Sequence, residues 1–468
     1  MVRIGARDRA AVIAARAAGR LTRATGRAGT SLPGLVAGRL SPGIVGRLAR
    51  TLGPVTLVSG TNGKTTTALT ISGILTATGR VVVSNPSGAN LGQAIATTIV
   101  ARAGLRLGRG VARDHAVLEV DEAALPSLMD QLPVAVLLLT NLFRDQLDRF
   151  GETDRIVRLW RAMLDRHPDV PIVFCADDPR VAALVRGRPN AHGYGFADRP
   201  ASGTSGSAVT TDVTTCPVCA APLVTAWVSV GHLGAYRCSV CDFARPTPEV
   251  SVEVAQDRGL AGQTLVFGLP GGRTLETPVS LIGTANAYNA AGALAVTLAL
   301  GVDAQAAVHA LSDAVPAFAR WERLDMAGRR VVLSLVKNPA SLDEVTRSGS
   351  VAHVDGVLFC MNDQHADGRD VSWYWDVDPT ALVPGRRIAI SGTRGPDLLL
   401  RLRYQLVQRP EDGIEGLIGL FDRPIDGLDA LVHAVPEGGS VLVVSTYTAL
   451  LGVRAALVKR GLVPAMPT

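Results

Sequence analysis

A single stretch near residue 60 constrains the fold more than any other part of the chain. Residues 55–59 form a β-branched apolar run, a glycine-rich turn follows, and residues 68–78 have the composition of a helix. This order of strand, glycine-rich loop and helix is typical of phosphate-binding loops. Glycine lets backbone N–H groups approach phosphate oxygens, and the start of the helix adds partial positive charge.

The residues of this loop define the predicted nucleotide site. The Lys64 ammonium would neutralise the β- and γ-phosphates, and the Thr65 hydroxyl would bind Mg²⁺. The predicted nucleotide-binding residues here are Gly60, Thr61, Asn62, Gly63, Lys64, Thr65 and Thr66. The generic pattern would place its first glycine where this chain has Val58, so the match is to the narrower form Gly-Thr-Asn-Gly-Lys-Thr-Thr. A glycine-rich turn without a ligand is the alternative.

Short apolar runs alternate with helical stretches from residue 55 to about residue 174. The predicted strands are residues 55–59, 80–83, 116–120, 134–140 and 172–175. Near-continuous Val, Ile and Leu runs joined by helices predict a parallel sheet covered on both faces, with ligands at the carboxyl ends of its strands. Glu119 ends the third strand and Asn141 follows the fourth. A carboxylate one strand away from a phosphate loop suits Mg²⁺, so Glu119 is a predicted metal ligand, with a helix N-cap or a surface acid as the alternative.

Four of the six cysteines form two Cys-x-x-Cys pairs. Cys216 and Cys219 are separated from Cys238 and Cys241 by eighteen residues, which is the spacing of a zinc ribbon. Four thiolates leave Zn²⁺ no open position, so the predicted site is structural, and redox use of the pairs is the alternative. Without a secretion signal, such cysteines favour a reducing, cytoplasmic location. The loop between the pairs has Arg237 as its only cation, which argues against nucleic-acid binding.

Two further regions carry polar residues in suggestive places. Asn286 and Asn289 are three residues apart in a predicted Ala-rich helix, so they share a face and could contact a nucleotide, with helix capping as the alternative. Beyond them, strands at 331–336, 356–360, 387–391 and 440–445 predict a second α/β unit. The loop after its second strand contains several acids, among them Asp367 and Asp370, and is either a binding loop or a solvated turn.

Residues 1–50 contain a single acid, Asp8, among many arginines. Apolar residues recur at helical spacing, so helices of the mature protein are predicted, and a transit peptide is the alternative. A basic amphipathic segment of this kind could also rest on a membrane face. No run of about 18 apolar residues appears, so no transmembrane segment is expected. The formal net charge of +6 is mild for 468 residues and does not by itself indicate nucleic-acid binding.

In this order, the motifs resemble those of the Mur ligases over positions 50 to about 330, and those of the MurT subunits of lipid II isoglutaminyl synthase over the whole chain. The residues that carry the resemblance are 60–66, 119–122, 140–152, Asn286 with 288–289, 320–322, the four cysteines, 337–339 and 366–373. The cysteine insertion and the Asp-Gly-Arg-Asp-Val-Ser-Trp loop separate the MurT type from ordinary Mur ligases. Residues 145–146 read Asp-Gln where many Mur ligases have a histidine, and 337–341 also depart from the family pattern.

The resemblance implies a role for each matching residue. Lys64 and the loop amides would bind ATP phosphates, and Thr65 and Glu119 would hold Mg²⁺. Asn141 belongs to the motif after the fourth strand and is included among the nucleotide-binding residues. Asn286 and Asn289 would contact the nucleotide, and Arg320 would reach its phosphate side. The implied catalytic residues are Lys64, Glu119, Asp367 and Asp370.

The implied reaction is amidation of the D-glutamate α-carboxylate in the stem peptide of lipid II, through an acyl phosphate made with ATP. Ammonia would come from glutamine, but the chain has no Gly-x-Cys-x-Gly elbow, and Cys360 is interpreted as a core residue. The resemblance therefore implies a GatD-type glutaminase partner in a heterodimer. Asp367 or Asp370, with a slight preference for Asp367, would complete the Cys-His pair of that partner.

The predicted fold is a Mur-ligase-like α/β protein in three parts. These are an N-terminal helical segment (1–50), an ATP-binding domain (51–325) with a zinc ribbon at about 212–246, and a MurT-type C-terminal α/β domain (326–468). The expected location is cytoplasmic, with a peripheral position at the inner membrane face as a possibility. One alternative function is a stand-alone Mur-type amino-acid ligase; another is a nucleotide-gated binding protein without turnover.

Overall fold

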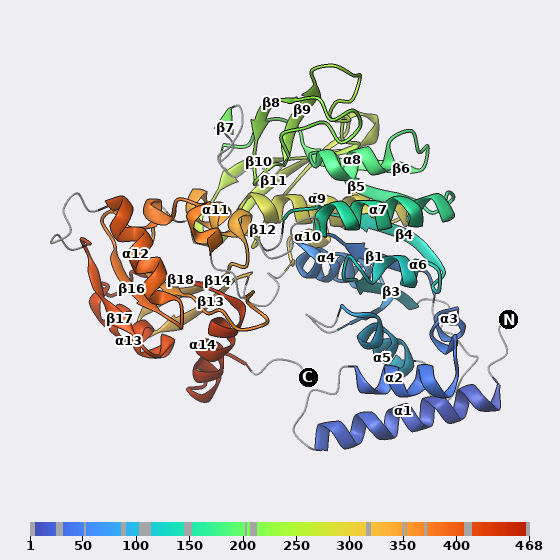
Figure 1. Cartoon of the computed structure of the whole chain (residues 1–468), viewed down its shortest axis with the longest axis horizontal. Helices are drawn as coiled ribbons and strands as arrows, with labels where there is room; N and C mark the ends of the chain where they lie inside the picture. The colour runs from blue at the N-terminus through green and yellow to red at the C-terminus, as the bar shows by residue number, and fades with distance from the viewer. Residues whose placement is uncertain are drawn as a thin grey trace.

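A computed structural model describes most of the chain and shows two α/β units joined side by side (Figure 1). The described residues are 5–24, 31–50, 53–85, 90–102, 114–144, 152–201, 204–205, 213–314, 320–348, 351, 353–368, 372–406 and 414–464. A small β-sheet insertion covers one end of the larger unit, and a pair of helices lies at its other end. The predicted α/β class with two separate sheets is confirmed.

The larger sheet is built around the strand that precedes the phosphate loop. Its strand order is β12-β11-β10-β6-β5-β4-β1-β3-β2, and neighbours from β2 through β10 are parallel. The strands are β1 (Val55–Ser59), β2 (Val81–Ser84), β3 (Asp114–Glu119), β4 (Val134–Leu139), β5 (Ile172–Cys175), β6 (Ala191–Phe196), β10 (Val250–Asp257), β11 (Gln263–Gly268) and β12 (Thr274–Val279). All five strands predicted between 55 and 175 are confirmed.

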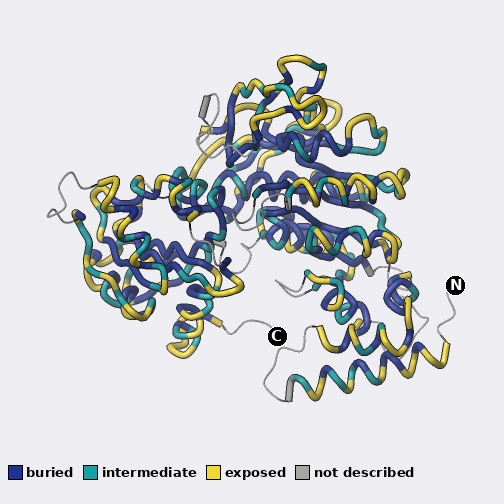
Figure 2. The backbone as a smooth tube through the Cα atoms, viewed as in Figure 1, coloured by how far each residue is buried: buried dark blue, intermediate teal, exposed yellow. Residues whose placement is uncertain are grey.

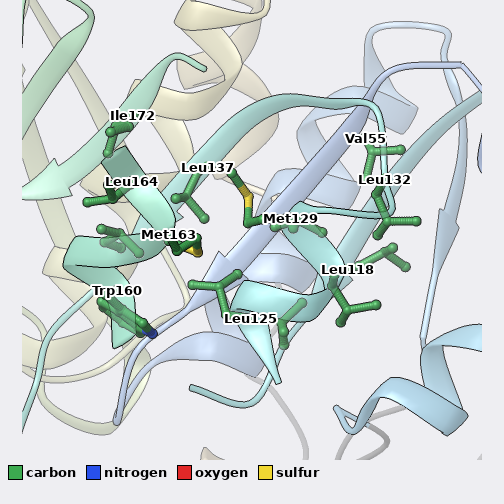
Figure 3. Packing of buried hydrophobic residues seen from close by; sticks show 14 of the residues in the cluster. Val55, Leu118, Leu125, Met129, Leu132, Leu137, Trp160, Met163, Leu164 and Ile172 are labelled. Carbon is green, nitrogen blue, oxygen red and sulfur yellow. The ribbon is translucent and has the colours of Figure 1, made fainter. Parts of the chain in front are cut away.

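Helices cover both faces of this sheet, as the continuous apolar strands predict. On one face Leu57, Leu118 and Trp160 belong to a cluster, part of which is drawn in Figure 3, under α6 (Leu125–Met129), α7 (Glu152–Arg166) and α8 (Pro179–Val185). On the other face Val58 and Leu138 pack against α4 (Lys64–Ala77), α9 (Thr284–Ala299) and α10 (Ala304–Leu311). In the tube coloured by burial the strands of this unit are dark, between partly exposed helices (Figure 2). The phosphate loop therefore lies at the carboxyl end of β1, between the two layers of helices.

The far edge of the sheet differs from the prediction. β11 and β12 are antiparallel, and β6, β10 and β11 were not predicted. In β11 buried and half-buried residues alternate, which is the period of a strand with one solvated face. A search for continuous apolar runs passes over such strands.

The insertion between β6 and β10 is a small antiparallel sheet of β7 (Thr204–Ser205), β8 (Leu223–Val228) and β9 (Gly234–Cys238). It lies at the top of the view in Figure 1, over the side of the sheet that carries β5 and α8. Two short 3₁₀ turns, Gly259–Ala261 and Pro270–Gly272, join the strands that follow it.

The second unit has the strand order β13-β14-β18-β15-β16-β17, with only β13 and β14 antiparallel. Its strands are β13 (Arg320–Met326), β14 (Arg329–Leu335), β15 (Gly356–Cys360), β16 (Arg387–Ser391), β17 (Leu417–Phe421) and β18 (Ser440–Ser445). Its helices are α11 (Pro339–Arg347), α12 (Gly395–Leu406), α13 (Pro424–Ala434) and α14 (Tyr447–Lys459), with 3₁₀ turns at Ser372–Trp375 and Pro379–Leu382. The four predicted strands are confirmed, whereas the edge strands β13 and β17 were missed. β13 pairs with β14, so the second sheet begins before the domain boundary predicted at 325.

Three helices precede the first strand, as predicted for residues 1–50. They are α1 (Ala6–Ala24), α2 (Leu32–Leu40) and α3 (Ile44–Ala49), and α2 packs on α5 (Gly92–Arg102) of the larger unit. The guanidinium of Arg7 donates to the carbonyl of Leu40 at 2.7 Å, which places the start of α1 beside the end of α2. Among the described residues, no helix is long and apolar enough to cross a membrane.

Candidate active site and metal centre

A pocket lies at the junction of the two α/β units, where the phosphate loop faces β14 and α11. The larger unit contributes the loop residues 61–66 and Glu119, Asn141, Asn286 and Asn289, and the second unit contributes Lys337, Ala340, Ser341 and Glu344. The structure thus brings together most of the predicted nucleotide residues. Gly60 lies directly before the lining segment. The side chain of Arg320 and all of Asp370 lie outside what the structure describes.

Side chains of neighbouring elements pack tightly against two glycines of the phosphate loop. Gly60 and Gly63 have φ values of +136° and +86°. A Cβ added to Gly60 would lie 2.1 Å from Thr140 Oγ1, and one added to Gly63 would lie 2.2 Å from Asn289 Oδ1. Only glycine fits both positions.

Asn141 holds the loop from the neighbouring strand β4. Its Oδ1 accepts from the N–H of Asn62 at 2.8 Å, its Nδ2 donates to the Asn62 carbonyl at 3.1 Å, and its own carbonyl accepts from the N–H of Thr61 at 2.8 Å. In the structure Asn141 is therefore a residue that shapes the loop.

Two lysines approach one carbonyl of the phosphate loop from opposite units. Lys64 Nζ donates to Thr61 O at 3.3 Å and Lys337 Nζ donates to the same oxygen at 3.0 Å. The chain contains only three lysines, so two of them lie at this pocket. A lysine ammonium is a compact point charge that commonly binds phosphate oxygens in such loops. Two positive charges therefore lie beside the phosphate loop, where they could bind a phosphate anion.

The charge of Lys64 is balanced by an acid that sequence reasoning did not single out. Lys64 pairs with Glu122 at 3.1 Å, and the two side chains are 10% and 18% exposed. In the sequence Glu122 is recognisable only as the last residue of the 119–122 motif. Its distance from Lys64 in sequence, 58 residues, explains why spacing alone did not reveal the pair.

The two predicted Mg²⁺ ligands are in direct contact. Glu119 is 5% exposed at the end of β3, and its Oε2 accepts from Thr65 Oγ1 at 2.8 Å. Asn85, after β2, exchanges two hydrogen bonds with the backbone of Glu119 and so fixes the end of the strand. A carboxylate and a hydroxyl beside a phosphate loop are the hard oxygen donors that Mg²⁺ takes. The donor set fits the ion.

Asn286 and Asn289 share a face of α9, as predicted. Asn289 Oδ1 accepts from Thr67 Oγ1 at 3.2 Å, and Asn289 Nδ2 donates to Asn286 Oδ1 at 3.0 Å. The capping alternative is wrong, because Gly283 is the N-cap residue of α9 and no side chain of its own helix caps it. Instead, Glu344 of α11 accepts from the N–H of Ala285 at 3.0 Å, and this bond ties the second unit to the start of α9.

The four cysteines form the predicted cluster. Their Sγ atoms lie within 4.8 Å of one another, with 3.7 Å between Cys216 and Cys241 and 3.5 Å between Cys219 and Cys238. Four sulfurs placed tetrahedrally at the usual Zn–S distance of ~2.3 Å would be ~3.8 Å apart. The backbone N–H groups of Cys241 and Val240 donate to Cys238 Sγ and lower the pKa of that thiol to about 6, which favours a thiolate ligand. The cluster fits a zinc ion, and no cysteine forms a disulfide.

Two buried carboxylates after β5 connect the cysteine insertion to the sheet. Asp178 accepts from the N–H groups of Arg180 and Val181 at the start of α8 and pairs with His232 at 3.0 Å, with both side chains fully buried. Burial opposes its charge, but His232 and the backbone donors hold the Asp178 pKa below its ordinary value. Asp177 pairs with Arg245 at 2.7 Å and accepts from the Tyr288 hydroxyl at 2.6 Å, while burial raises its pKa. These acids therefore attach the insertion and do not line the pocket.

Asp367 is buried in the loop after β15. Its Oδ1 accepts from the N–H of Thr448 at 2.7 Å, and its Oδ2 accepts from the N–H of Gln364 at 3.1 Å and from the Thr448 hydroxyl. The side chain thus joins its loop to the first turn of α14. Cys360 is fully buried at the end of β15 and burial raises its pKa, as expected for a core residue.

Comparison with known proteins agrees with this geometry. Residues 58–238 match the model of the Mur ligase middle domain, and residues 335–450 match the model of the MurT ligase C-terminal domain. The chain is 30% identical over 443 residues to the lipid II isoglutaminyl synthase (glutamine-hydrolyzing) subunit MurT of Streptococcus pneumoniae, covering 93% of this chain and 94% of that protein. It is 28% identical to the MurT subunit of Staphylococcus aureus, covering 86% and 88%.

Solved structures share the fold at low identity. The chain is similar to a pseudomurein peptide ligase type C from Methanothermus fervidus, with a TM-score of 0.63 at 18% identity over 87% of this chain and 79% of that chain. It is also similar to the MurF ligase from Thermotoga maritima solved with ADP, with a TM-score of 0.60 at 14% identity, covering 89% and 82%. The sequence match to the first of the MurT subunits extends over nearly the whole of both chains. The chain therefore belongs to the MurT family, a branch of the Mur ligases.

Proposed function

We propose that this chain is the ATP-dependent synthetase subunit that converts the D-glutamate of the lipid II stem peptide to D-isoglutamine. The observation that carries this proposal is the pocket in which the phosphate loop and Glu119 meet Lys337 and Glu344 of the MurT-type unit. Membership of the MurT family supplies the substrate class. Because ATP is cytoplasmic, we place the reaction in the cytoplasm, at the inner membrane face where lipid II is exposed.

The proposed reaction has two steps. The α-carboxylate oxygen attacks the γ-phosphorus of ATP, which gives an acyl phosphate and releases ADP. Ammonia then attacks the acyl carbon, phosphate leaves with the electron pair of the C–O bond, and a proton is lost as the amide forms. Mg²⁺, held by Thr65 and Glu119, would neutralise phosphate charge in the first step. Lys64 and Lys337 would stabilise the charge that develops on the transferred group, and Asn286 and Asn289 would contact the nucleotide.

The ammonia source is assigned to a partner. Cys360 is fully buried at the end of β15, so its thiol is not accessible as a nucleophile. We propose a GatD-type glutaminase as the second subunit, with zinc in the cysteine cluster as a structural ion. Ammonia is mostly protonated near neutral pH, so direct delivery from the partner would favour the second step.

The test is mass spectrometry of lipid II incubated with the protein, ATP and Mg²⁺. With ammonium chloride we expect the mass decrease that accompanies replacement of a carboxyl hydroxyl by an amino group, without any partner. With glutamine the same product should form only when the glutaminase is added. Release of ADP with an added amino acid but no amidation under either condition would contradict the proposal and point to a stand-alone ligase.

Variants at Asp367 and Asp370 separate the two candidates for the triad. If one of these acids completes the triad, its conversion to asparagine should lower glutamine-driven amidation roughly 10²-fold or more. The same variant should leave the ammonium-driven rate intact. Asp363→Asn, in the same loop and paired with Arg394 at the surface, is the matched control. If neither variant changes the ratio of the two rates, neither Asp367 nor Asp370 completes the triad of the partner.

Asp367→Asn should also have a structural effect. Each oxygen of Asp367 accepts from a backbone N–H, so the amide NH₂ of asparagine must face a donor in either orientation. Leaving buried donors unpaired costs about 1–3 kcal/mol, which a thermal melt of the variant would show. A melting temperature equal to that of the parent protein would contradict the contacts assigned to this side chain.

A further inference from the structure

Helix α1 has two chemically different faces. Its inner face is formed by Asp8, Ala11, Val12, Ala15 and Gly19, which are buried. Its outer face carries Arg9, Ile13, Ala17, Arg20 and Leu21, all exposed, with Ile13 at 55% and Leu21 at 71%. Arg9 and Arg20 are eleven residues apart, about three turns, so they lie on one line; Ile13 lies about 40° to one side of it, and Leu21 about 100° from Arg20 on that same side. α1 is the outermost element at its end of the molecule (Figure 1).

The outer face of α1, defined as Arg9, Ile13, Ala17, Arg20 and Leu21, has no acidic residue. Residues 1–50 contain ten arginines and one acid, Asp8. That acid is 5% exposed and accepts from Ser41 and from Arg47, at 2.5 Å and 2.7 Å, and the Arg47 guanidinium lowers its pKa. Within the described part of the chain, the side chains of Arg9 and Arg20 make no ion pair. The only negative charge of the segment is thus neutralised inside, and the outer face presents cations beside apolar side chains.

This end of the molecule is connected to the pocket through one helix. The N–H of Gly34 in α2 donates to Thr97 Oγ1 in α5 at 2.8 Å, and a Cβ at Gly34 would lie 2.1 Å from the Gln93 carbonyl. α5 begins two residues after Asn90, which lines the pocket, and Leu91 between them is 52% exposed. The helices of the N-terminal segment therefore pack within two turns of the pocket rim.

We propose that the outer face of α1 docks on an anionic phospholipid bilayer. Exposed arginines attract an anionic surface, and Ile13 and Leu21 can enter the headgroup region beside them. We choose a bilayer as the partner because of this charge complementarity. The biological purpose of the docking rests on the proposed function. A substrate anchored in the membrane by its lipid would then present its stem peptide to a pocket held close to the same surface.

The test is cosedimentation of the full chain with vesicles of phosphatidylcholine alone or of equal parts phosphatidylcholine and phosphatidylglycerol, without ATP or lipid II. Binding is expected only to the anionic vesicles and should weaken as salt rises. Arg9→Glu with Arg20→Glu should lower the partition coefficient at least about tenfold, and Ile13→Ser with Leu21→Ser should lower it at constant charge. Arg158→Glu with Arg161→Glu, two exposed positions on α7, is the charge-matched control and should bind like the parent protein.

Three outcomes would overturn the proposal: equal binding to neutral vesicles, no binding to either kind, or an equal loss in the α7 control. Tighter binding of duplex DNA than of anionic vesicles through Arg9 and Arg20 would also overturn it. The vesicle assay reads docking without catalysis, so its failure is distinct from failure of the amidation assay. If both proposals hold, the α1 variants should amidate lipid II normally in detergent and poorly in anionic vesicles.

Discussion

Lys64→Met should lower the rate constant for ATP-dependent amidation roughly 10²- to 10³-fold, the usual cost of removing one group that stabilises transition-state charge. Lys64 is 9% exposed, and its ammonium lies between the Gly60 and Thr61 carbonyls and Glu122. A γ-phosphoryl group bound in the loop would accept from the Lys64 ammonium in place of these oxygen atoms. Steady-state kinetics with ammonium as the nitrogen donor would measure the effect independently of the partner.

The three lysines of the chain provide the controls. Lys459→Met removes an exposed lysine at the end of α14 and should leave the rate unchanged. Lys337→Met removes the second cation beside Thr61 but leaves the loop intact, so a smaller loss is expected. Glu122→Gln removes the ion-pair partner and keeps the cation. A Lys64→Met enzyme with kcat within a few-fold of the parent would show that the charge at this position does not act in the transition state.

The phosphate loop could be predicted from the sequence and the contact between the two units could not, and this difference has a physical cause. The phosphate loop and β1 are local, because the glycine positions and the apolar strand are consecutive residues with a known period. The contact between Lys337 and Thr61 joins residues 276 positions apart, and it exists only because the second unit packs against the first. No local pattern records that packing.

For the two acids after β5, the sequence position suggests a ligand site, but the fold gives them partners within the protein. Asp177 and Asp178 occupy the strand-end position at which ligand-binding acids are expected. Their partners, Arg245, His232 and Tyr288, come from the cysteine insertion and from α9. The sequence places both acids at the end of a strand but cannot show that residues of other segments pair with them. Glu119 differs from these acids, because its hydroxyl partner Thr65 belongs to the phosphate loop itself.

The turn that joins β8 to β9 connects the hairpin of the cysteine insertion to the phosphate loop. In this turn His232 pairs with Asp178, whose Oδ2 accepts from the N–H of Leu142 at 2.8 Å. The ring of His232 lies 4.5 Å from that of Phe143, and the N–H of Phe143 donates to Thr61 Oγ1 at 3.1 Å. Every link in this chain is buried. A zinc ion held by the cluster should therefore influence nucleotide binding, although none of the four cysteines lines the pocket.

Loss of zinc should weaken ATP binding about tenfold or more, because it should disorder the hairpin that carries His232. Structural Zn²⁺ supplies roughly 10–16 kcal/mol of folding free energy to small cysteine domains. Cys219→Ser should abolish the stoichiometric zinc measured by atomic absorption, lower the melting temperature and reduce the ATP affinity measured by calorimetry. Val240→Ser, at a 76% exposed position beside Cys238, is the control and should retain zinc and affinity.

A second variant distinguishes coupling from general unfolding. His232 does not line the pocket, and His232→Ala removes both the pair with Asp178 and the ring contact with Phe143 while all four cysteines remain, so this variant should keep its zinc and still lose ATP affinity. If instead Cys219→Ser lost its zinc and bound ATP as tightly as the parent, the cluster would stabilise only its own hairpin. We expect ATP affinity to be lost in both variants and zinc to be lost in only one. This pattern would show that the insertion stabilises the phosphate loop, because His232 and Asp178 connect the folded hairpin to Leu142 and Phe143.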